Sequence, residues 1–260
     1  NFNHSSMHYW GVWHGREPIE NFAKNVGRFI AEYGYQSFPD YETLAEVMKT
    51  EDLHLESEQM KNRQKSYIGN GIIADNIKKY AHKENDFAKW IELSQQVQAH
   101  AYGYAIRQHR VQTPHCMGTL FWQLNDCWPG PSWSIIDYYG NKKVAYESVK
   151  KHYKPQIASF EITKTGVDIS LVSDALSLTN TTCSVDLINA KKQVVYTYSQ
   201  SVNLEFLTPQ TIQINLPKKW LKRLNKKASQ YHFKLALEVG EKTVYQTNYY
   251  PDKNSTILFH

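Results

Sequence analysis

The sequence predicts an α/β domain over residues 1–155, followed by an all-β domain over residues 156–260. In the first part, short apolar runs alternate with longer amphipathic stretches, a pattern typical of strands that helices connect into a parallel sheet. In the second part, apolar and polar residues alternate with period two in about seven short runs, a pattern typical of antiparallel strands. The change of period near residue 156 places the domain boundary there.

The elements of the first part can be placed in order along the chain. Residues 7–14 are a candidate strand or strand end, and the apolar residues 29–32 form the next strand. Pro39 fits the first turn of a helix, where its fixed φ is tolerated. A last helix should start at Asn141, capped by its side chain, and end before Pro155. The remaining elements are helices over residues 55–64, 72–82 and 86–112 and a strand over residues 118–124.

This β-α order places an active site at the C-terminal ends of the strands. About three strands are recognisable before the pattern changes, and three strands cannot close an eight-stranded barrel. We therefore expect residues 1–155 to be the C-terminal portion of a (β/α)8 TIM barrel that the chain enters partway round. The chain would then be a piece of a longer polypeptide.

The second part consists of short alternating runs separated by turns at residues such as Gly166 and Gly240. About seven antiparallel strands in a segment of this length predict an immunoglobulin-like β-sandwich. The runs are residues 160–163, 167–172, 183–188, 194–198, 211–216, 232–239 and 244–247.

Charge and hydropathy argue against two classes of partner. The net charge of +5 is spread along the chain, so no nucleic acid partner is expected. No apolar run is long enough to span a membrane, so no membrane partner is expected either. The densest basic cluster, residues 218–227, is interpreted as the solvated face of a short helix, with a polyanion site as the alternative.

Two predicted strands end on polar and aromatic side chains. The apolar residues 29–31 lead into Glu32, and residues 117–121 lead into Trp122 and the polar residues after it. Two strands that open onto such groups at the same end of a sheet favour one shared pocket. The 18 tyrosines and 7 tryptophans suit sugar binding, because aromatic faces stack on pyranose C–H faces, although most are equally expected in the core. By itself, a carboxylate at a strand end is more often a cap or an ion-pair partner.

Three motifs in this region carry a resemblance to a known family. They are residues 32–39, 118–133 and 137–140, with Arg28 and residues 8–10 in fitting positions. Over residues 7–155 the chain resembles the C-terminal part of the β-mannosidases of glycoside hydrolase family 2. Residues 156–260 resemble the domain that follows the barrel in those enzymes in architecture alone.

The resemblance implies roles for individual residues. Glu32 would be the catalytic nucleophile, near the end of strand seven of the barrel, and Trp122 would form the floor of the sugar pocket. Trp10, Trp13 and His14, near the expected end of strand six, are further candidates for substrate binding, with a structural role equally expected. The mechanism needs no cofactor and no metal, and the histidines lack carboxylate partners at ligand spacing.

The function implied is that of a retaining exo-β-mannosidase, which removes terminal β-D-mannose from oligosaccharides or glycans. The acid/base glutamate would lie in the missing N-terminal part of the same enzyme, so we expect the isolated chain to be inactive. Its exposed apolar edges should cause self-association. Another exo-glycosidase of family 2, such as an exo-β-glucosaminidase, β-galactosidase or β-glucuronidase, is the nearest alternative. A non-catalytic carbohydrate-binding or structural module is the other, and the sequence leaves the compartment undetermined.

Overall fold

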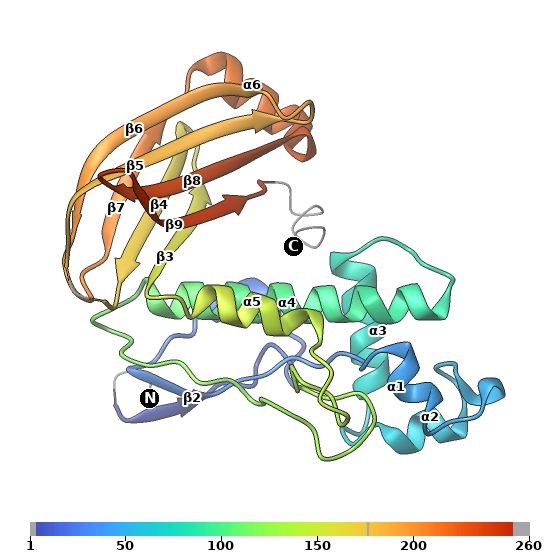
Figure 1. The fold of residues 1–260 in the computed structure, drawn as a ribbon. Helices are drawn as coiled ribbons and strands as arrows, with labels where there is room; N and C mark the ends of the chain where they lie inside the picture. Colours follow the sequence, from blue (N-terminus) through green and yellow to red (C-terminus); the bar gives the residue numbers. More distant parts are fainter. Residues whose placement is uncertain (1–3, 176, 252–260) are drawn as a thin grey trace. The chain divides into compact units, whose positions relative to one another are not determined.

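The computed structural model describes residues 4–175 and 177–251 and divides into two compact units. The first unit contains residues 4–109 and 115–153, and the second contains residues 110–114 and the described residues from 154 onward (Figure 1). Residues 1–3, Leu176 and residues 252–260, which the predicted domains include, lie outside the described residues. The protein is a mixed α/β structure with antiparallel sheets, which confirms the predicted combination of helices and strands.

The first unit contains a short parallel pair of strands, β1 (Ser6–His8) and β2 (Phe29–Glu32). The strand predicted over residues 29–32 is confirmed, whereas the candidate over residues 7–14 ends at His8 because the chain then turns, with His14 N donating to Trp10 O at 2.9 Å.

The strand predicted over residues 118–124 is only partly correct. This segment lies parallel to β2, since Ile30 N donates to Gly118 O at 2.9 Å and Leu120 N donates to Ile30 O at 2.8 Å. No continuous strand forms there, because the segment leaves the ladder after Leu120 and Trp122 N bonds to Tyr33 O at 2.7 Å instead. The segment therefore lies beside β2, but the two do not pair regularly along its whole predicted length.

Five α-helices and two short 3-10 helices lie in the described part of the first unit, close to the predicted positions. The long helix α4 and the last helix α5 pack side by side (Figure 1), with Ser148 Oγ donating to Ala99 O at 2.8 Å. The helices are α1 (Tyr41–Ala45), α2 (Glu58–Arg63), α3 (Gly69–Tyr80), α4 (Phe87–Arg110), α5 (Val144–His152), η1 (Ile19–Ala23) and η2 (Thr50–Asp52).

The predicted capping role of Asn141 is wrong. Helix α5 has Lys143 at its N-cap, and Val144 N is satisfied by Gln95 Oε1 of α4 at 3.0 Å. Asn141 Nδ2 instead donates to Asp137 Oδ2 at 3.1 Å, and Asn141 N donates to Asp137 Oδ1 at 2.8 Å. The carboxylate of Asp137 thus holds Asn141 in the turn that precedes the helix.

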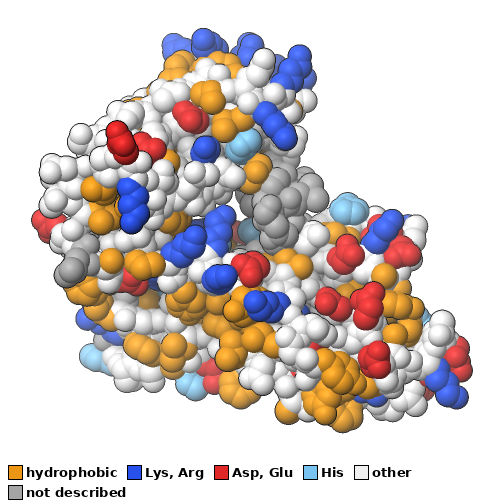
Figure 2. All heavy atoms as spheres, viewed as in Figure 1, with side chains coloured by type: hydrophobic (Ala, Val, Ile, Leu, Met, Phe, Trp, Pro, Cys, Tyr) orange, Lys and Arg blue, Asp and Glu red, His pale blue; other side chains and the backbone are white. Residues whose placement is uncertain are grey.

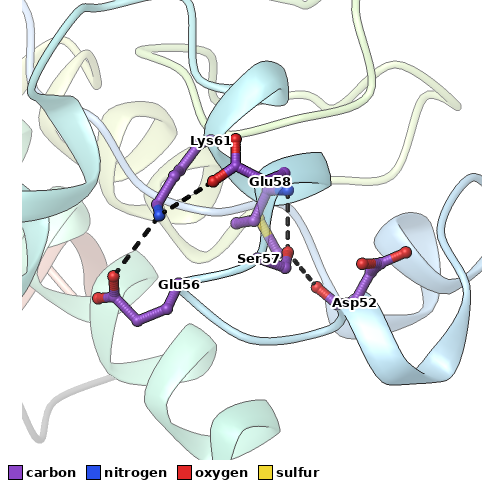
Figure 3. A network of polar contacts seen from close by, with 6 residues as sticks. Asp52, Glu56, Ser57, Glu58 and Lys61 are labelled. Atoms are coloured by element: carbon purple, nitrogen blue, oxygen red, sulfur yellow. Dashed lines mark hydrogen bonds and ion pairs between the residues drawn. The ribbon is translucent and has the colours of Figure 1, made fainter.

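Helix α2 has an N-cap of the expected chemistry (Figure 3). Ser57 Oγ accepts from Met60 N at 3.0 Å, which satisfies one of the free N–H groups of the first turn, and donates to Asp52 O at 2.6 Å. Lys61 lies between Glu58 and Glu56, at 3.4 and 3.9 Å, but all three side chains are exposed. The serine cap is therefore the larger contribution, because exposed ion pairs contribute little.

The second unit is built from two antiparallel sheets, and each of the seven predicted runs coincides with a strand. Alternate residues such as Val167, Ile169 and Leu171 are fully buried, which explains the period-two pattern. One sheet has the order β3-β4-β7 and the other β6-β5-β8-β9, and their inner faces share one apolar core. The strands are β3 (Gln156–Ile162), β4 (Gly166–Ser173), β5 (Leu178–Asn189), β6 (Val194–Leu204), β7 (Gln210–Asn215), β8 (Tyr231–Val239) and β9 (Lys242–Tyr249).

The basic cluster forms helix α6 (Lys218–Lys227), followed by the short η3 (Ala228–Gln230). Trp220 and Leu224 are buried in the sandwich core, and Lys219 and Arg223 lie over the Trp220 ring at 5.1 and 4.8 Å. Lys and Arg side chains gather on the surface over this helix (Figure 2). In the part of the chain that the structure describes, no helix is long and apolar enough to cross a membrane.

Candidate active site

Glu32 is the last residue of β2, the strand whose Ile30 is buried in the first unit. Trp10 Nε1 donates to Glu32 Oε1 at 2.9 Å, and His8 Nδ1 lies 3.5 Å from Glu32 Oε2. The backbone is fixed as well, since Tyr9 N donates to Glu32 O at 2.8 Å. The carboxylate is therefore oriented by an indole N–H while its side chain remains 27% exposed.

Trp122 combines a fixed backbone with an accessible ring. Trp122 N donates to Tyr33 O at 2.7 Å, and Trp122 O accepts from the hydroxyl of Tyr102 at 2.7 Å. The Trp122 residue is nevertheless 46% exposed. An aromatic ring held at its backbone and open on its surface can serve as a platform for an apolar ligand face.

Gly34 allows three tryptophans to approach the same point. A Cβ atom at Gly34 would lie 2.5 Å from Trp122 O, 2.8 Å from Trp133 Cδ1 and 2.9 Å from Trp10 Cη2. These contacts are closer than any side chain permits, so the absence of a side chain is what the packing requires. Two residues after Glu32, Gly34 thus brings the strand end, the loop before β2 and the segment after Leu120 together.

Trp133, which the sequence analysis did not single out, contributes a further aromatic ring next to Trp10 and Trp13. Its ring meets Trp10 edge-on at 5.9 Å and Trp13 at 6.2 Å. Tyr102 also donates to Trp133 O at 2.7 Å. No local pattern identifies it, because its ring contacts with Trp10 and Trp13 join residues more than 100 positions apart.

Of the further candidates, Trp10 and His14 lie at the site and Trp13 lies beneath it. His14 is exposed and lies 5.1 Å from the Trp10 ring and 6.3 Å from the Trp133 ring. Trp13 is 0% exposed and packs against Tyr35 at 5.5 Å. With no accessible face, Trp13 can support the other aromatic rings but cannot itself stack on a ligand.

The polar residues after Trp122 hold the loop together. Asp126 Oδ2 accepts from Ser132 Oγ at 2.6 Å and from Ser134 Oγ at 2.5 Å. These bonds give Asp126 a structural role in the loop. Among the described residues, no group of three or more histidine, cysteine or acidic side chains is arranged to hold a metal.

No family model matches the chain. Beta-mannosidase B of Thermothelomyces thermophilus is 34% identical over 166 residues, which is 57% of this chain and 19% of that protein. Beta-mannosidase B of Emericella nidulans is 36% identical over 154 residues, which is 57% of this chain and 18% of that protein. The chain thus matches less than a fifth of the length of these curated relatives.

Solved structures resemble almost the whole chain. A β-D-mannosidase from Dictyoglomus thermophilum covers 96% of it with a TM-score of 0.84 and 25% identity, and the match takes up 30% of that structure. The exo-chitosanase CsxA of Amycolatopsis orientalis covers 94% of this chain with a TM-score of 0.64 and 18% identity, again over 30% of that structure. At that identity, the second likeness shows the fold alone.

Proposed function

This chain matches the C-terminal part of the β-mannosidases of glycoside hydrolase family 2, and we propose that it belongs to a retaining exo-β-mannosidase. In this proposal the first unit is the C-terminal portion of the TIM barrel and the second is the immunoglobulin-like sandwich. The observation that carries the proposal is the placement of Glu32 at the end of β2, beside the parallel segment that leads to Trp122.

Glu32 is the nucleophile in this proposal. Its carboxylate attacks the anomeric carbon of a terminal β-mannose and forms a covalent glycosyl-enzyme intermediate, which water then hydrolyses. The hydrogen bond from Trp10 Nε1 at 2.9 Å fixes the orientation of the Glu32 carboxylate before attack. Trp122 provides the face on which the sugar stacks.

The reaction also needs a second carboxyl group, roughly 5–5.5 Å from the nucleophile in retaining enzymes. In this proposal that acid/base residue belongs to a part of the whole enzyme outside residues 1–260. It protonates the leaving oxygen and later activates the water. The chain alone should therefore have no turnover, and Glu32-dependent hydrolysis by pure chain would contradict this point.

Trapping of the intermediate tests the proposal directly. The full-length protein is treated with activated 2-fluoro glycosides of mannose, galactose, glucose and glucuronic acid, and the labelled peptide is mapped by mass spectrometry. A label on Glu32 from the mannoside alone is the expected result. Glu32→Gln should abolish the label, and Glu46→Gln, which changes an exposed carboxylate of another segment, should leave it unchanged.

A different sugar specificity within family 2 is the alternative that the same experiment resolves. The likeness to an exo-chitosanase over 94% of the chain shows that this fold is compatible with another exo-acting enzyme. Labelling of Glu32 by a sugar other than mannose would keep the mechanism and change the substrate. Absence of a label from every sugar, with intact protein, would leave Glu32 with a structural role, as in a non-catalytic module.

Self-association of the isolated chain is part of the proposal. Apolar side chains are exposed along β2 and the segment beside it, with Met117 at 50%, Leu120 at 53% and Leu124 at 57%. Sedimentation velocity should show association that decreases in Met117→Lys/Leu120→Lys. The control is Val194→Lys, which changes an apolar residue of the second unit that is 54% exposed. A wild-type chain that sediments as a monomer would contradict this expectation.

A further inference from the structure

A row of aromatic rings leads away from the candidate nucleophile to an exposed tyrosine. Trp10 bonds to Glu32, the His14 ring lies 5.1 Å from the Trp10 ring, and the Tyr67 ring lies 6.4 Å from the His14 ring. The His14 and Tyr67 rings are nearly parallel, at 8°. Tyr67 is thus separated by two ring contacts from the indole that binds Glu32.

Tyr67 is held in place by its neighbours and is not itself buried. Ser66 is 4% exposed, and its N–H donates to Gln64 Oε1 at 2.9 Å. On the other side, Gly69 N, at the start of α3, donates to Ser66 O. Tyr67 between these anchors is 77% exposed, the largest exposure of any large hydrophobic side chain in the described residues. An anchored loop that presents its aromatic side chain to solvent has the form of a binding surface.

Trp128, the other aromatic residue in contact with this loop, already has contacts with two cationic side chains. Lys65 Nζ lies 4.4 Å from the centre of the Trp128 ring, Arg63 lies 5.3 Å from it, and Trp128 Nε1 donates to Arg63 O at 3.2 Å. By contrast, the Tyr67 hydroxyl has no hydrogen bond to any described residue, and its recorded ring contact is with His14 alone. Tyr67 therefore has both a ring face and a hydroxyl available for a ligand, and Trp128 does not.

We propose that Tyr67, supported by His14, forms a second sugar-binding subsite that holds the leaving-group side of an oligosaccharide. This inference rests on the proposed function. An exo-acting enzyme binds a single sugar, the terminal one, on the non-reducing side of the bond that it breaks. A second ring-binding surface therefore holds sugars of the leaving group. The Tyr67 ring stacks on a pyranose C–H face, and the exposed His14 ring adds a hydrogen-bonding group at its edge. The preferred substrate is then an oligosaccharide rather than a mannoside with a small leaving group.

The test compares two substrates in the full-length protein. Methyl β-D-mannoside has no second ring, and a β-linked manno-oligosaccharide of three sugars has rings beyond the scissile bond. For Tyr67→Ala we expect KM for the trisaccharide to rise roughly tenfold, with kcat unchanged, which is the size of one aromatic stacking contact. For the methyl glycoside, kcat/KM should not change.

Three controls make the outcome specific. Tyr67→Phe keeps the ring and should retain the wild-type KM if stacking is the contact. Phe206→Ala removes a 55% exposed aromatic residue of the second unit and should affect neither substrate. Wild-type protein that hydrolyses no mannoside would show that the proposed function fails. Wild-type activity with either no effect of Tyr67→Ala, or an equal loss on both substrates, would overturn the subsite alone.

Discussion

Gly34→Ala should destabilise the first unit because the added methyl group has no room. The Cβ atom would lie 2.5 Å from the carbonyl oxygen of Trp122, a backbone atom that is itself held by Tyr102 at 2.7 Å. Two ring atoms, of Trp133 and Trp10, would lie within 2.9 Å. Neither the backbone nor two packed indoles can yield as a flexible side chain would, so the site itself must shift.

The cost follows from two effects. Overpacking of a rigid core costs about 1–3 kcal/mol. Displacement of the Trp122 carbonyl also weakens its bond to Tyr102, which adds about 1 kcal/mol. We therefore expect a loss of roughly 2–4 kcal/mol in the free energy of unfolding. In the full-length protein the same shift moves Trp122 and Trp10 away from their positions beside Glu32, so turnover should fall as well.

Urea unfolding monitored by tryptophan fluorescence measures the loss, since every tryptophan except Trp220 lies in the first unit. Gly71→Ala is the matched control. Gly71 is exposed within α3, and a Cβ atom there meets nothing within 4 Å. That variant should be stabilised by up to about 1 kcal/mol through helix propensity. A Gly34→Ala midpoint equal to or above the wild-type value would refute the packing argument.

Three further changes test the cap and two buried ionisable groups in the same assay. Ser57→Ala should lose about 1 kcal/mol, because the α2 cap to Met60 N is removed, whereas Lys61→Ala should change stability by less than about 0.5 kcal/mol; equal effects would contradict this. Burial lowers the pKa of His109 to about 4, below its unfolded value of about 6.5. Between pH 4 and 6.5, His109 therefore binds a proton in the unfolded chain but not in the folded one, so the free energy of unfolding falls as the pH drops through this range. His109→Gln should make the free energy of unfolding less dependent on pH in this range. Burial also lowers the pKa of Lys143 from 10.5 to about 8. Between pH 8 and 10.5 the unfolded chain therefore keeps a proton on Lys143 that the folded chain releases, so the free energy of unfolding rises with pH in this range. Lys143→Met should remove this rise, which amounts to about 3 kcal/mol in all, and an unchanged pH profile would be the contrary result.

The strands of the second unit were predictable because the pattern that folds them is local. Residues such as Val167 and Ile169 alternate with polar neighbours, and this alternation identifies a strand with one buried face whatever its partner. The long helix α4 was predictable for the same reason, since its apolar residues recur at helical spacing over many turns. Glu32 and Trp122 stand at the ends of such patterns, and the resemblance to the β-mannosidases of glycoside hydrolase family 2 is what implied their roles.

Other features could not be predicted because they depend on which residues meet. Asn141 has a side chain that can cap a helix, but this side chain donates to the carboxylate of Asp137. The first N–H of α5 donates instead to the side chain of Gln95, which belongs to helix α4. The segment after Gly118 has an apolar strand pattern, yet Trp122 N bonds to Tyr33 and the regular ladder ends there. In both cases a local preference is overridden by a hydrogen bond to another part of the fold.

The sequence by itself thus determined the α/β-then-β order of the chain and the positions of most of its elements. Periodicity and residue type are local properties, and these conclusions require nothing else. Only the tertiary structure decided that Trp13 is buried while Trp133 and Tyr67 join the aromatic row beside Glu32. Those arrangements arise from packing between segments far apart in the chain, and at Gly34 the missing side chain leaves room for Trp10 and Trp133.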